Sequence, residues 1–539
     1  MKQLRLLPVI LVSLAVIGTG LYGCAQREDP LAGKSVLDRA LSSDPESLDP
    51  QKHRSTQAAD ALRDIGEGLT GHSPGGDMVP AAAESWEASD DGLTYTFKIR
   101  KDARWSNGDS VSAKDFVFGL QRLVDPATGA FYAAELSNVV NAKAIIAGEL
   151  PPEELGVSAP DDATLIITLT RRTPYLLSLL GHPSTFPVHR ESVEIHGDAF
   201  ARAGNLVSNG AYSLKSWEPG SIIELHRNEY HWNVENIAID VVRHHIITQE
   251  AAELTRYRAG ELHVTSTVPP DGFDQLREEF GDQLHIAPTN GNYYYGFNLD
   301  KPPFRDNPAL RKALSMAVDR EVLTEKIIGR GEEPAYSWVP PGLFNYEPVQ
   351  LPYAGLSQDE RNSLARSLYR EAGYSDVNPL RFELRYNTSD THGRIALAIQ
   401  AMWREVLGAE ATLVNVEFQV LLDQMREAEV TQMFRSSWFG DYNDPNTFLA
   451  LMRSDSEANT PHYRSEDYDG LMDKANDQLD PTGRRLYLEE AERQLLTDHP
   501  VIPLYFYVGK HLVRPEVRGW QDNTLNYHYS QHLSLDPTE

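Results

Sequence analysis

The sequence predicts an α/β fold with two or three domains. Its 539 residues exceed what one hydrophobic core normally serves. Alternation of apolar and polar residues, which is typical of half-buried strands, is clearest in the first half of the chain. Apolar residues at helical spacing become frequent in the second half, with further strands between them. Two large lobes with a cleft between them fit this pattern.

The N-terminus has the layout of a signal peptide. Lys2 and Arg5 precede an apolar run over residues 6–17, and small residues lead on to Cys24. This run is shorter than the ~20 apolar residues that a helix needs to span a bilayer. We therefore expect the chain to be exported and its first 23 residues to be removed.

Cys24 is the only cysteine of the chain, so no intramolecular disulfide can form. Leu21-Tyr22-Gly23-Cys24 resembles the bacterial lipobox, in which a signal peptidase cuts before a cysteine that carries lipid, although Tyr22 stands where small residues are usual. The alternative is an ordinary signal sequence that ends near a chance cysteine. We expect a lipid on Cys24 to be the only attachment to a membrane.

Composition excludes two classes of protein. The formal net charge of −28 argues against a nucleic-acid partner, because phosphate binding needs clustered Lys and Arg. Solubility in a crowded compartment is the simpler explanation of the acid excess. A hydrophobic content of 41% argues against a disordered chain.

Strands dominate the first half of the chain. Residues 92–100 alternate between apolar and polar, which predicts a strand, and Ser112 with Asp115 three residues later predicts the start of a helix. The other strands predicted here are 161–169, 209–214, 222–225 and 239–247, and the second and third of these flank a Pro-Gly turn as a hairpin.

Helices become frequent in the second half. Asn307 precedes Pro308, and apolar residues then recur at helical spacing as far as Val318, so a helix is predicted to begin there. Comparable spacing predicts helices over 363–372, 395–407 and 484–496.

No catalytic motif is present. The sequence lacks HExxH, GxxxxGK[ST], GxSxG and a GxGxxG that opens a helix after a strand. The adjacent His244 and His245 lie in a predicted strand and face opposite sides, so they cannot easily share a metal ion. We therefore expect no enzyme activity, no metal and no cofactor.

The segment 436–445 is the clearest candidate for ligand contacts. It follows a predicted strand, precedes a predicted helix start at Asn446, and contains Trp438, Asp441 and Tyr442. A carboxylate enclosed by aromatic rings needs a cation, because its charge is poorly solvated there. The alternative is that Asp441 only caps a turn.

A series of motifs then makes the chain recognisable. They are residues 76–86, 91–97, 104–109, 112–116, 209–212, 257–261, 301–304, 311–320, 386–390 and 502–507. In this order they resemble the family 5 extracellular solute-binding proteins, which are the oligopeptide and dipeptide binders of ABC importers. The resemblance extends from about residue 35 to 530. Residues 182–185, 386–390 and 441–445 look especially like the oligopeptide-binding and murein-peptide-binding branches.

This resemblance implies a two-lobed periplasmic-binding-protein-like fold of type II, in three parts, with one lobe discontinuous in sequence. The ligand would be enclosed between the lobes. The expected division is a signal peptide 1–23, a tether 24–35, lobe I from 36–79, 196–293 and 509–539, an extra domain II over 80–195, and lobe III over 294–508.

The resemblance also implies site residues. Asp441 matches the aspartate that pairs with the peptide's α-ammonium, a charge-assisted hydrogen bond that would demand a free N-terminus. The other residues expected around the ligand are Trp438, Phe439, Gly440, Tyr132, His392, Phe418, Arg435, Tyr507, Glu67, Gly68 and Leu69. Phe439 and Phe418 stand where the oligopeptide binder has a cysteine and a tryptophan, so the side-chain pockets need not accept the same residues. Met425 and Arg426 both remain open as the match to a family arginine.

The expected function is the substrate-binding component of an ABC peptide importer. It would hold short peptides by main-chain contacts, close about a hinge and deliver them to the permease subunits as a monomer in the periplasm or cell envelope. One alternative is a narrower ligand such as a murein peptide, a dipeptide or a metal complex, for which Arg435 and Arg426 could bind carboxylates. A lipid-anchored peptidase or chaperone is the alternative from another class.

Overall fold

The computed structural model describes residues 31–426, 432–456 and 458–536. Every described helix and strand lies within residues 35–539. The predicted signal peptide and Cys24 therefore lie outside the described residues. The side chains of Phe418 and Arg426 also lie outside them, so the roles expected for these residues stay predictions.

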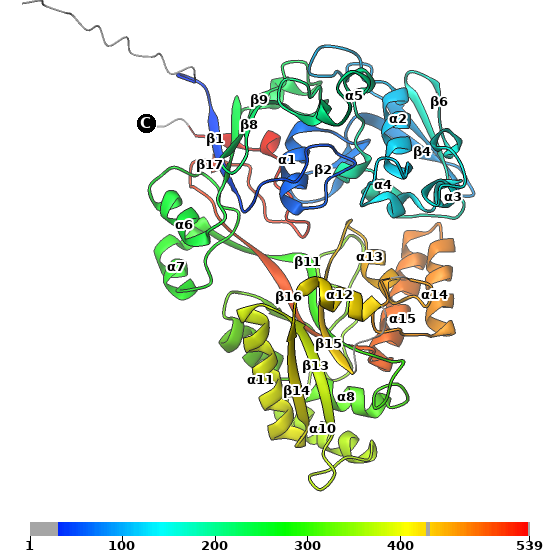
Figure 1. The fold of residues 1–539 in the computed structure, drawn as a ribbon, viewed down its shortest axis with the longest axis vertical. Helices are drawn as coiled ribbons and strands as arrows, with labels where there is room; N and C mark the ends of the chain where they lie inside the picture. Colours follow the sequence, from blue (N-terminus) through cyan, green and yellow to red (C-terminus); the bar gives the residue numbers. More distant parts are fainter. Residues whose placement is uncertain (1–30, 427–431, 457, 537–539) are drawn as a thin grey trace, which may run out of the picture. The chain divides into compact units, whose positions relative to one another are not determined.

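Four strands from distant parts of the chain form the first sheet (Figure 1). β1 (Val36–Leu41) is parallel to β10 (Val241–Ile246), and β10 continues antiparallel to β9 (Ile222–Arg227) and then β8 (Tyr212–Glu218). The hairpin and the following strand that the sequence predicts in this region are confirmed.

The hydrophobic core beneath the first sheet contains residues from both ends of the described chain. α1 (Thr56–Ile65) begins after Ser55, whose side chain accepts a hydrogen bond from the Ala58 amide. It buries Leu62 with strand residues of the first sheet, and Leu533 from the C-terminal segment packs there too. Two small two-stranded sheets also form: β2 (Thr70–His72) with β3 (Met78–Pro80), and β17 (Val517–Arg518) with β18 (Ser534–Leu535).

A second sheet, entirely antiparallel, lies within residues 83–168. Its order is β4 (Ala83–Ala88), β5 (Thr94–Ile99), β7 (Thr164–Thr168) and β6 (Val157–Asp161). α2 (Ala113–Val124) packs on it and begins with the predicted capping box, in which the Ser112 amide donates to Asp115 Oδ2 at 2.8 Å. Shorter helices follow: α3 (Ala142–Ile146), α4 (Leu176–Leu179) and α5 (Arg190–His196).

The third sheet has six strands and the largest hydrophobic core. Its order is β12 (Glu333–Pro334), β16 (Val501–Leu512), β11 (Leu284–Phe297), β15 (Met433–Phe439), β13 (Arg381–Asn387) and β14 (Glu410–Val416). The helices of this region are α8 (Pro308–Met316), α9 (Arg320–Val322), α10 (Gln358–Glu371), α11 (Asp390–Leu407), α12 (Phe418–Arg426), α13 (Asn446–Leu449), α14 (Glu466–Asp477) and α15 (Pro481–Asp498).

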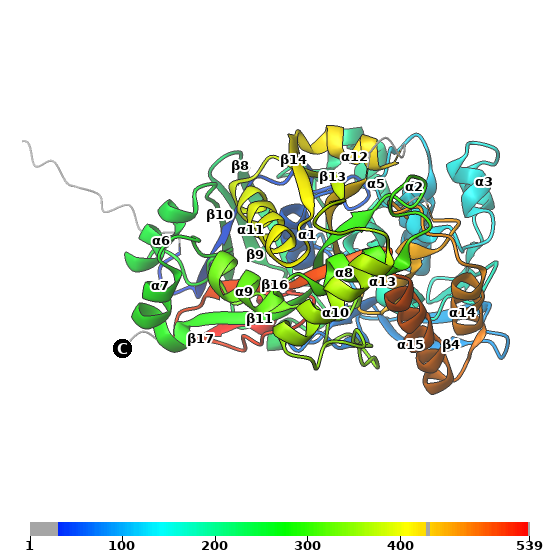
Figure 2. The same cartoon turned by 90° about the horizontal axis from the view of Figure 1, so that it is seen from below.

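Two long strands connect the regions. β11 and β16 run antiparallel and side by side (Figures 1 and 2), and they lead from helices α6 (Glu250–Arg258) and α7 (Phe273–Phe280) into the third sheet. The expected domain borders after residues 293 and 508 both fall inside these strands. Paired strands of this kind can bend as a hinge between two lobes.

Candidate functional site

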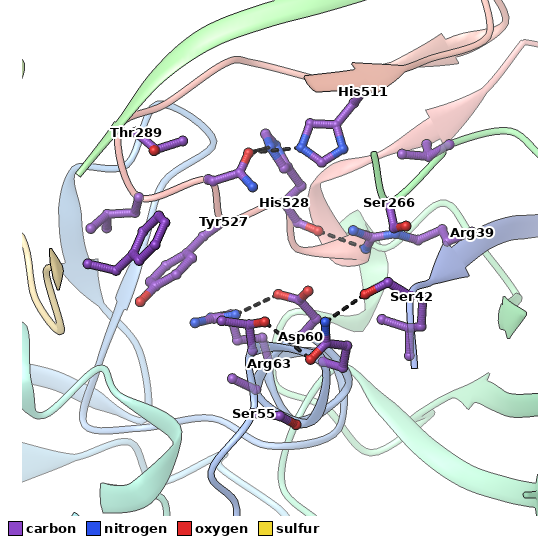
Figure 3. A pocket seen from close by; sticks show the side chains of 18 of the residues that line it. Arg39, Ser42, Ser55, Asp60, Arg63, Ser266, Thr289, His511, Tyr527 and His528 are labelled. Atoms are coloured by element: carbon purple, nitrogen blue, oxygen red, sulfur yellow. Dashed lines mark hydrogen bonds and ion pairs between the residues drawn. The ribbon is translucent and has the colours of Figure 1, made fainter. Parts of the chain in front are cut away.

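A cavity of about 360 Å³ opens where the first sheet faces the end of the third. Figure 3 shows part of its wall, with Arg39 on β1, Asp60 and Arg63 on α1, and Tyr527 and His528 on the C-terminal segment. The opposite wall is made by Thr289, Asn290, Phe439, Gly440 and Asp441, and Tyr132 and His182 contribute from a third side. The cavity therefore collects residues from all three parts of the fold.

Asp441 lies in the loop after β15 and lines this cavity. Among the described residues, its carboxylate has neither a hydrogen-bond donor nor an ion-pair partner; only its backbone amide is bonded, to Thr447 Oγ1 at 3.2 Å. Asp444 caps the next turn instead, accepting from the Asn446 amide at 2.9 Å and pairing with Arg484 at 2.7 Å. Burial raises the pKa of Asp441 to about 6.

Gly440 is required by its surroundings. An added Cβ would lie 2.8 Å from the Asn290 side-chain nitrogen and 2.8 Å from a methyl carbon of Thr447. The Gly440 amide donates to the Asn290 carbonyl at 2.8 Å, and the Asn290 side-chain amide donates back to the Gly440 carbonyl at 2.7 Å. This close approach of two backbones holds Asp441 at the cavity wall.

Arg435 lies on β15, six positions before Asp441, and is buried without an acidic partner among the described residues. Its Nη1 donates to Asn387 Oδ1 at 3.2 Å and its Nη2 to the Tyr507 hydroxyl at 3.0 Å. The guanidinium carbon lies 4.6 Å from the centre of the Tyr293 ring, and Nε is buried without a partner. Within the described part of the chain Arg435 has no ion pair, so its charge is available to an anion.

His392 and Phe439 complete this group. His392 belongs to α11, and its ring centre is 5.6 Å from that of Tyr293. Burial and the nearby Arg435 lower the pKa of His392 to about 4, so its imidazole is neutral at pH 7. The Phe439 side chain is 52% exposed and its ring centre is 4.7 Å from that of Tyr507, which connects the arginine group to the cavity.

Trp438 lies on the opposite side of β15 from Phe439, because side chains alternate along a strand. Its ring packs against the core of the third sheet, and its Nε1 reaches Thr447 Oγ1 at 3.5 Å. Trp438 therefore supports the Asp441 loop from behind and does not line the cavity.

One edge of β15 is open. β15 pairs with β11 from Met433 to Phe439, but it pairs with β13 only at Met433 and Phe434. From Arg435 to Phe439 no described strand covers the other edge. Unpaired main-chain groups on a strand edge are a template for an extended peptide.

The three residues expected from the first lobe do not reach this cavity. Glu67 and Gly68 line a second, smaller cavity of about 130 Å³, where Glu67 Oε2 accepts a hydrogen bond from Trp232 Nε1 at 3.0 Å. Leu69 is 1% exposed and packs in the core of the second sheet. Arg63 lines both cavities and is the only residue of α1 to do so.

Glu135 is a candidate that sequence reasoning missed. It lies in a short 3₁₀ turn, Ala133–Leu136, directly after Tyr132, and its Oε2 is buried without a partner. Burial and the charge of Asp441 raise its pKa well above 4.5. No local pattern marks this glutamate, because the groups around it come from distant parts of the chain. Among the described residues no group of three or more His, Cys, Asp or Glu side chains could hold a metal ion.

The family model of the bacterial extracellular solute-binding proteins, family 5 Middle, matches residues 77–460. The chain belongs to this family. It is 38% identical to the periplasmic oligopeptide-binding protein OppA of Escherichia coli over 493 residues, which cover 91% of this chain and 90% of that protein. The fold class and the resemblance found in the sequence are thereby confirmed.

Two solved structures of family members are similar to the fold. The unliganded open form of the periplasmic murein tripeptide-binding protein MppA superposes with a TM-score of 0.85 at 35% identity, covering 93% of this chain and 98% of that one. Haemophilus influenzae OppA in complex with the peptide RPPGFSPFR superposes with a TM-score of 0.76 at 37% identity, covering 93% and 99%. No described helix of this solute-binding protein has the length and apolar character needed to cross a bilayer.

Proposed function

We propose that this chain is the substrate-binding component of an ABC importer and that it captures short peptides with free ends. The observation that carries the proposal is a pair of opposite charges on one strand and the loop after it. Arg435 is buried, Asp441 lines the cavity, and neither has an ion-pair partner among the described residues. A zwitterion supplies both missing charges, with its ammonium at Asp441 and its carboxylate at Arg435.

The open edge of β15 lies between these two charges. An extended peptide can add to it as a further strand, so that main-chain hydrogen bonds provide affinity without reading the peptide sequence. Six residues of strand span at most ~20 Å at a rise of about 3.3 Å per residue. The two anchors therefore accommodate peptides of at most about six residues if both ends are held at once.

The relatives support a peptide ligand. Escherichia coli OppA is named for oligopeptides, and Haemophilus influenzae OppA was solved with the nine-residue peptide RPPGFSPFR, whereas MppA is named for a murein tripeptide. The narrower ligand, a murein peptide, offers additional carboxylates and is the second candidate. Arg435 is the observation that favours it, because its guanidinium has donors left for an anion.

The cellular setting belongs to the same proposal. The chain would be exported to the periplasm, held at the membrane by lipid on Cys24 and active as a monomer that docks on permease subunits. The relatives' names place those proteins in the periplasm. Expression of Cys24→Ser tests the anchor: the variant should leave the membrane fraction, whereas a variant that stays there contradicts a lipid on this residue.

Calorimetry with three forms of one tripeptide tests the binding mode. Ala-Ala-Ala should bind most tightly, the N-acetylated form should lose about 100-fold or more, and the C-amidated form about tenfold. Equal affinity for all three would contradict the two charged anchors. Mass spectrometry of the recovered peptide distinguishes binding from peptidase activity, because a binding protein returns it intact.

A further inference from the structure

A carboxylate that the proposed contacts leave unused, that of Glu135, lies in the turn that follows Tyr132 of the cavity wall. Tyr132 lines the cavity beside Asp441, and its ring centre is 4.6 Å from that of His182. Glu135 follows three residues later in a 3₁₀ turn, where side chains at this spacing lie one above the other. The Glu135 amide donates to the Tyr132 carbonyl at 3.1 Å, which fixes the turn.

No cation in the described part of the chain pairs with Glu135. Its Oε2 is fully buried without a hydrogen-bond partner, and the carboxylate has no ion pair among the described residues. The titratable groups that interact with it are Tyr132 on its own turn, and Asp441 and Tyr442 from the loop after β15. Tyr442 is itself occupied, since its hydroxyl accepts a hydrogen bond from the Asn446 side-chain amide at 3.0 Å.

Arg63, a basic side chain on the cavity wall, already has partners of its own. Arg63 Nη1 pairs with Asp60 at 2.8 Å, and its guanidinium carbon lies 3.4 Å above the Tyr527 ring. Figure 3 shows Arg63 beside Asp60, with Tyr527 next to it. The positive charge of Arg63 lowers the pKa of Tyr132, but it is not a cause of the pKa shifts of Glu135 and Asp441.

Two carboxylates in one poorly solvated site can both be ionised only when more than one positive charge lies beside them; otherwise one of them holds a proton. The α-ammonium of a peptide supplies a single one. A lysine, arginine or ornithine side chain on the first residue supplies the second, and it starts from the same carbon atom as the α-ammonium. We propose, resting on the proposed peptide-binding function, that Glu135 is a specificity-determining residue that selects peptides whose first residue has a cationic side chain.

Calorimetry with two matched tripeptides tests this selection. Lys-Ala-Ala and norleucine-Ala-Ala have side chains of similar length, and only the first has a terminal ammonium. The unaltered protein should bind Lys-Ala-Ala about tenfold more tightly or better. Glu135→Gln should bind the norleucine peptide within threefold of the unaltered protein and should have lost the preference for lysine.

Two further variants control for folding and net charge. Glu135→Asp keeps the charge on a shorter stem and should retain part of the preference. Glu149→Gln removes an exposed glutamate from the same region and should retain all of it. Thermal melts establish that each variant is folded before binding is compared.

The outcomes separate the two hypotheses. If the unaltered protein binds the norleucine peptide but shows no preference for lysine, the role of Glu135 is wrong and peptide binding stands. If a folded Glu135→Gln variant still prefers the lysine peptide, the role of Glu135 is likewise wrong and peptide binding stands. If neither peptide binds the unaltered protein, the proposed function fails, and this inference with it.

Discussion

Burial raises the pKa values of two carboxylates of this protein, Glu492 and Asp441, but the protein satisfies only one of them with hydrogen bonds. Glu492 on α15 lies in the core of the third sheet, and burial raises its pKa to about 7. It accepts hydrogen bonds from the Trp338, Val339 and Val349 amides and from the Tyr346 hydroxyl, at 2.7–2.9 Å. At the cavity, no described residue donates a hydrogen bond to the Asp441 carboxylate.

The comparison shows what distinguishes a ligand site from a structural one. A raised pKa is common to both, so burial alone does not identify a site. The number of protein donors does distinguish them, because a carboxylate that the protein satisfies has little capacity left for a ligand. Arg435 follows the same rule, since its Nε is buried without a partner beside the open strand edge.

The largest expected effect is at Glu492. Glu492→Ala leaves three amides and one hydroxyl without an acceptor in a buried region, and we expect a loss of about 4 kcal/mol in the free energy of unfolding. Urea unfolding measures it. Glu490→Ala, on the exposed side of the same helix, should cost less than about 0.5 kcal/mol. If Glu492→Ala lowers the free energy of unfolding by less than about 1 kcal/mol, the hydrogen bonds to Glu492 do not make it a structural carboxylate in contrast to Asp441.

Asp441→Asn should act on binding and leave stability intact. We expect the affinity for a free-amine tripeptide to fall by about 2–5 kcal/mol, because the ammonium loses its charged partner. The free energy of unfolding should stay the same or rise slightly, since a poorly solvated charge is removed. Asp444→Asn is the control: it breaks the pair with Arg484 and should lower stability instead. Unchanged affinity in calorimetry would remove Asp441 from the site.

Arg435→Gln should weaken the binding of peptides with a free carboxylate by about 1.5–3 kcal/mol. The same variant should bind C-amidated peptides almost as well as the unaltered protein does, because these lack the anionic end. Calorimetry with both peptide forms and both proteins gives the coupling between guanidinium and carboxylate. A coupling near zero would show that the carboxylate binds elsewhere.

The effect of pH should be the smallest. Peptide binding needs the ionised form of Asp441, so affinity should be full above pH 6 and should fall by up to ~tenfold per pH unit below it. For the unliganded protein the sign is opposite: the raised pKa favours folding at low pH, and this stability is lost as pH rises through about 6. Asp441→Asn should flatten the binding profile; a profile that keeps its slope assigns the titration to another group.

Local sequence patterns predicted the presence of helices and strands more accurately than the residues at which the helices begin. Ser112 and Asp115 form the predicted capping box, because both partners lie within one turn. The helices predicted from 363, 395 and 484 begin earlier, at Gln358, Asp390 and Pro481. Their first turns are polar, so apolar spacing does not reveal them, and the caps Ser357, Ser389 and Asp480 mark the true starts.

The sequence by itself determined the α/β class, the family and the presence of an aspartate in an aromatic loop, because these depend on neighbouring residues and on motif order. Only the tertiary structure decided which charged groups remain unsatisfied. Asp441 and Asp444 are three residues apart, yet one is paired and the other faces a cavity. The charge of Asp441 raises the pKa of Glu135 although the two residues are about 300 positions apart in the chain. Whether a buried charge has a partner depends on the elements packed around it, and no local pattern contains that information.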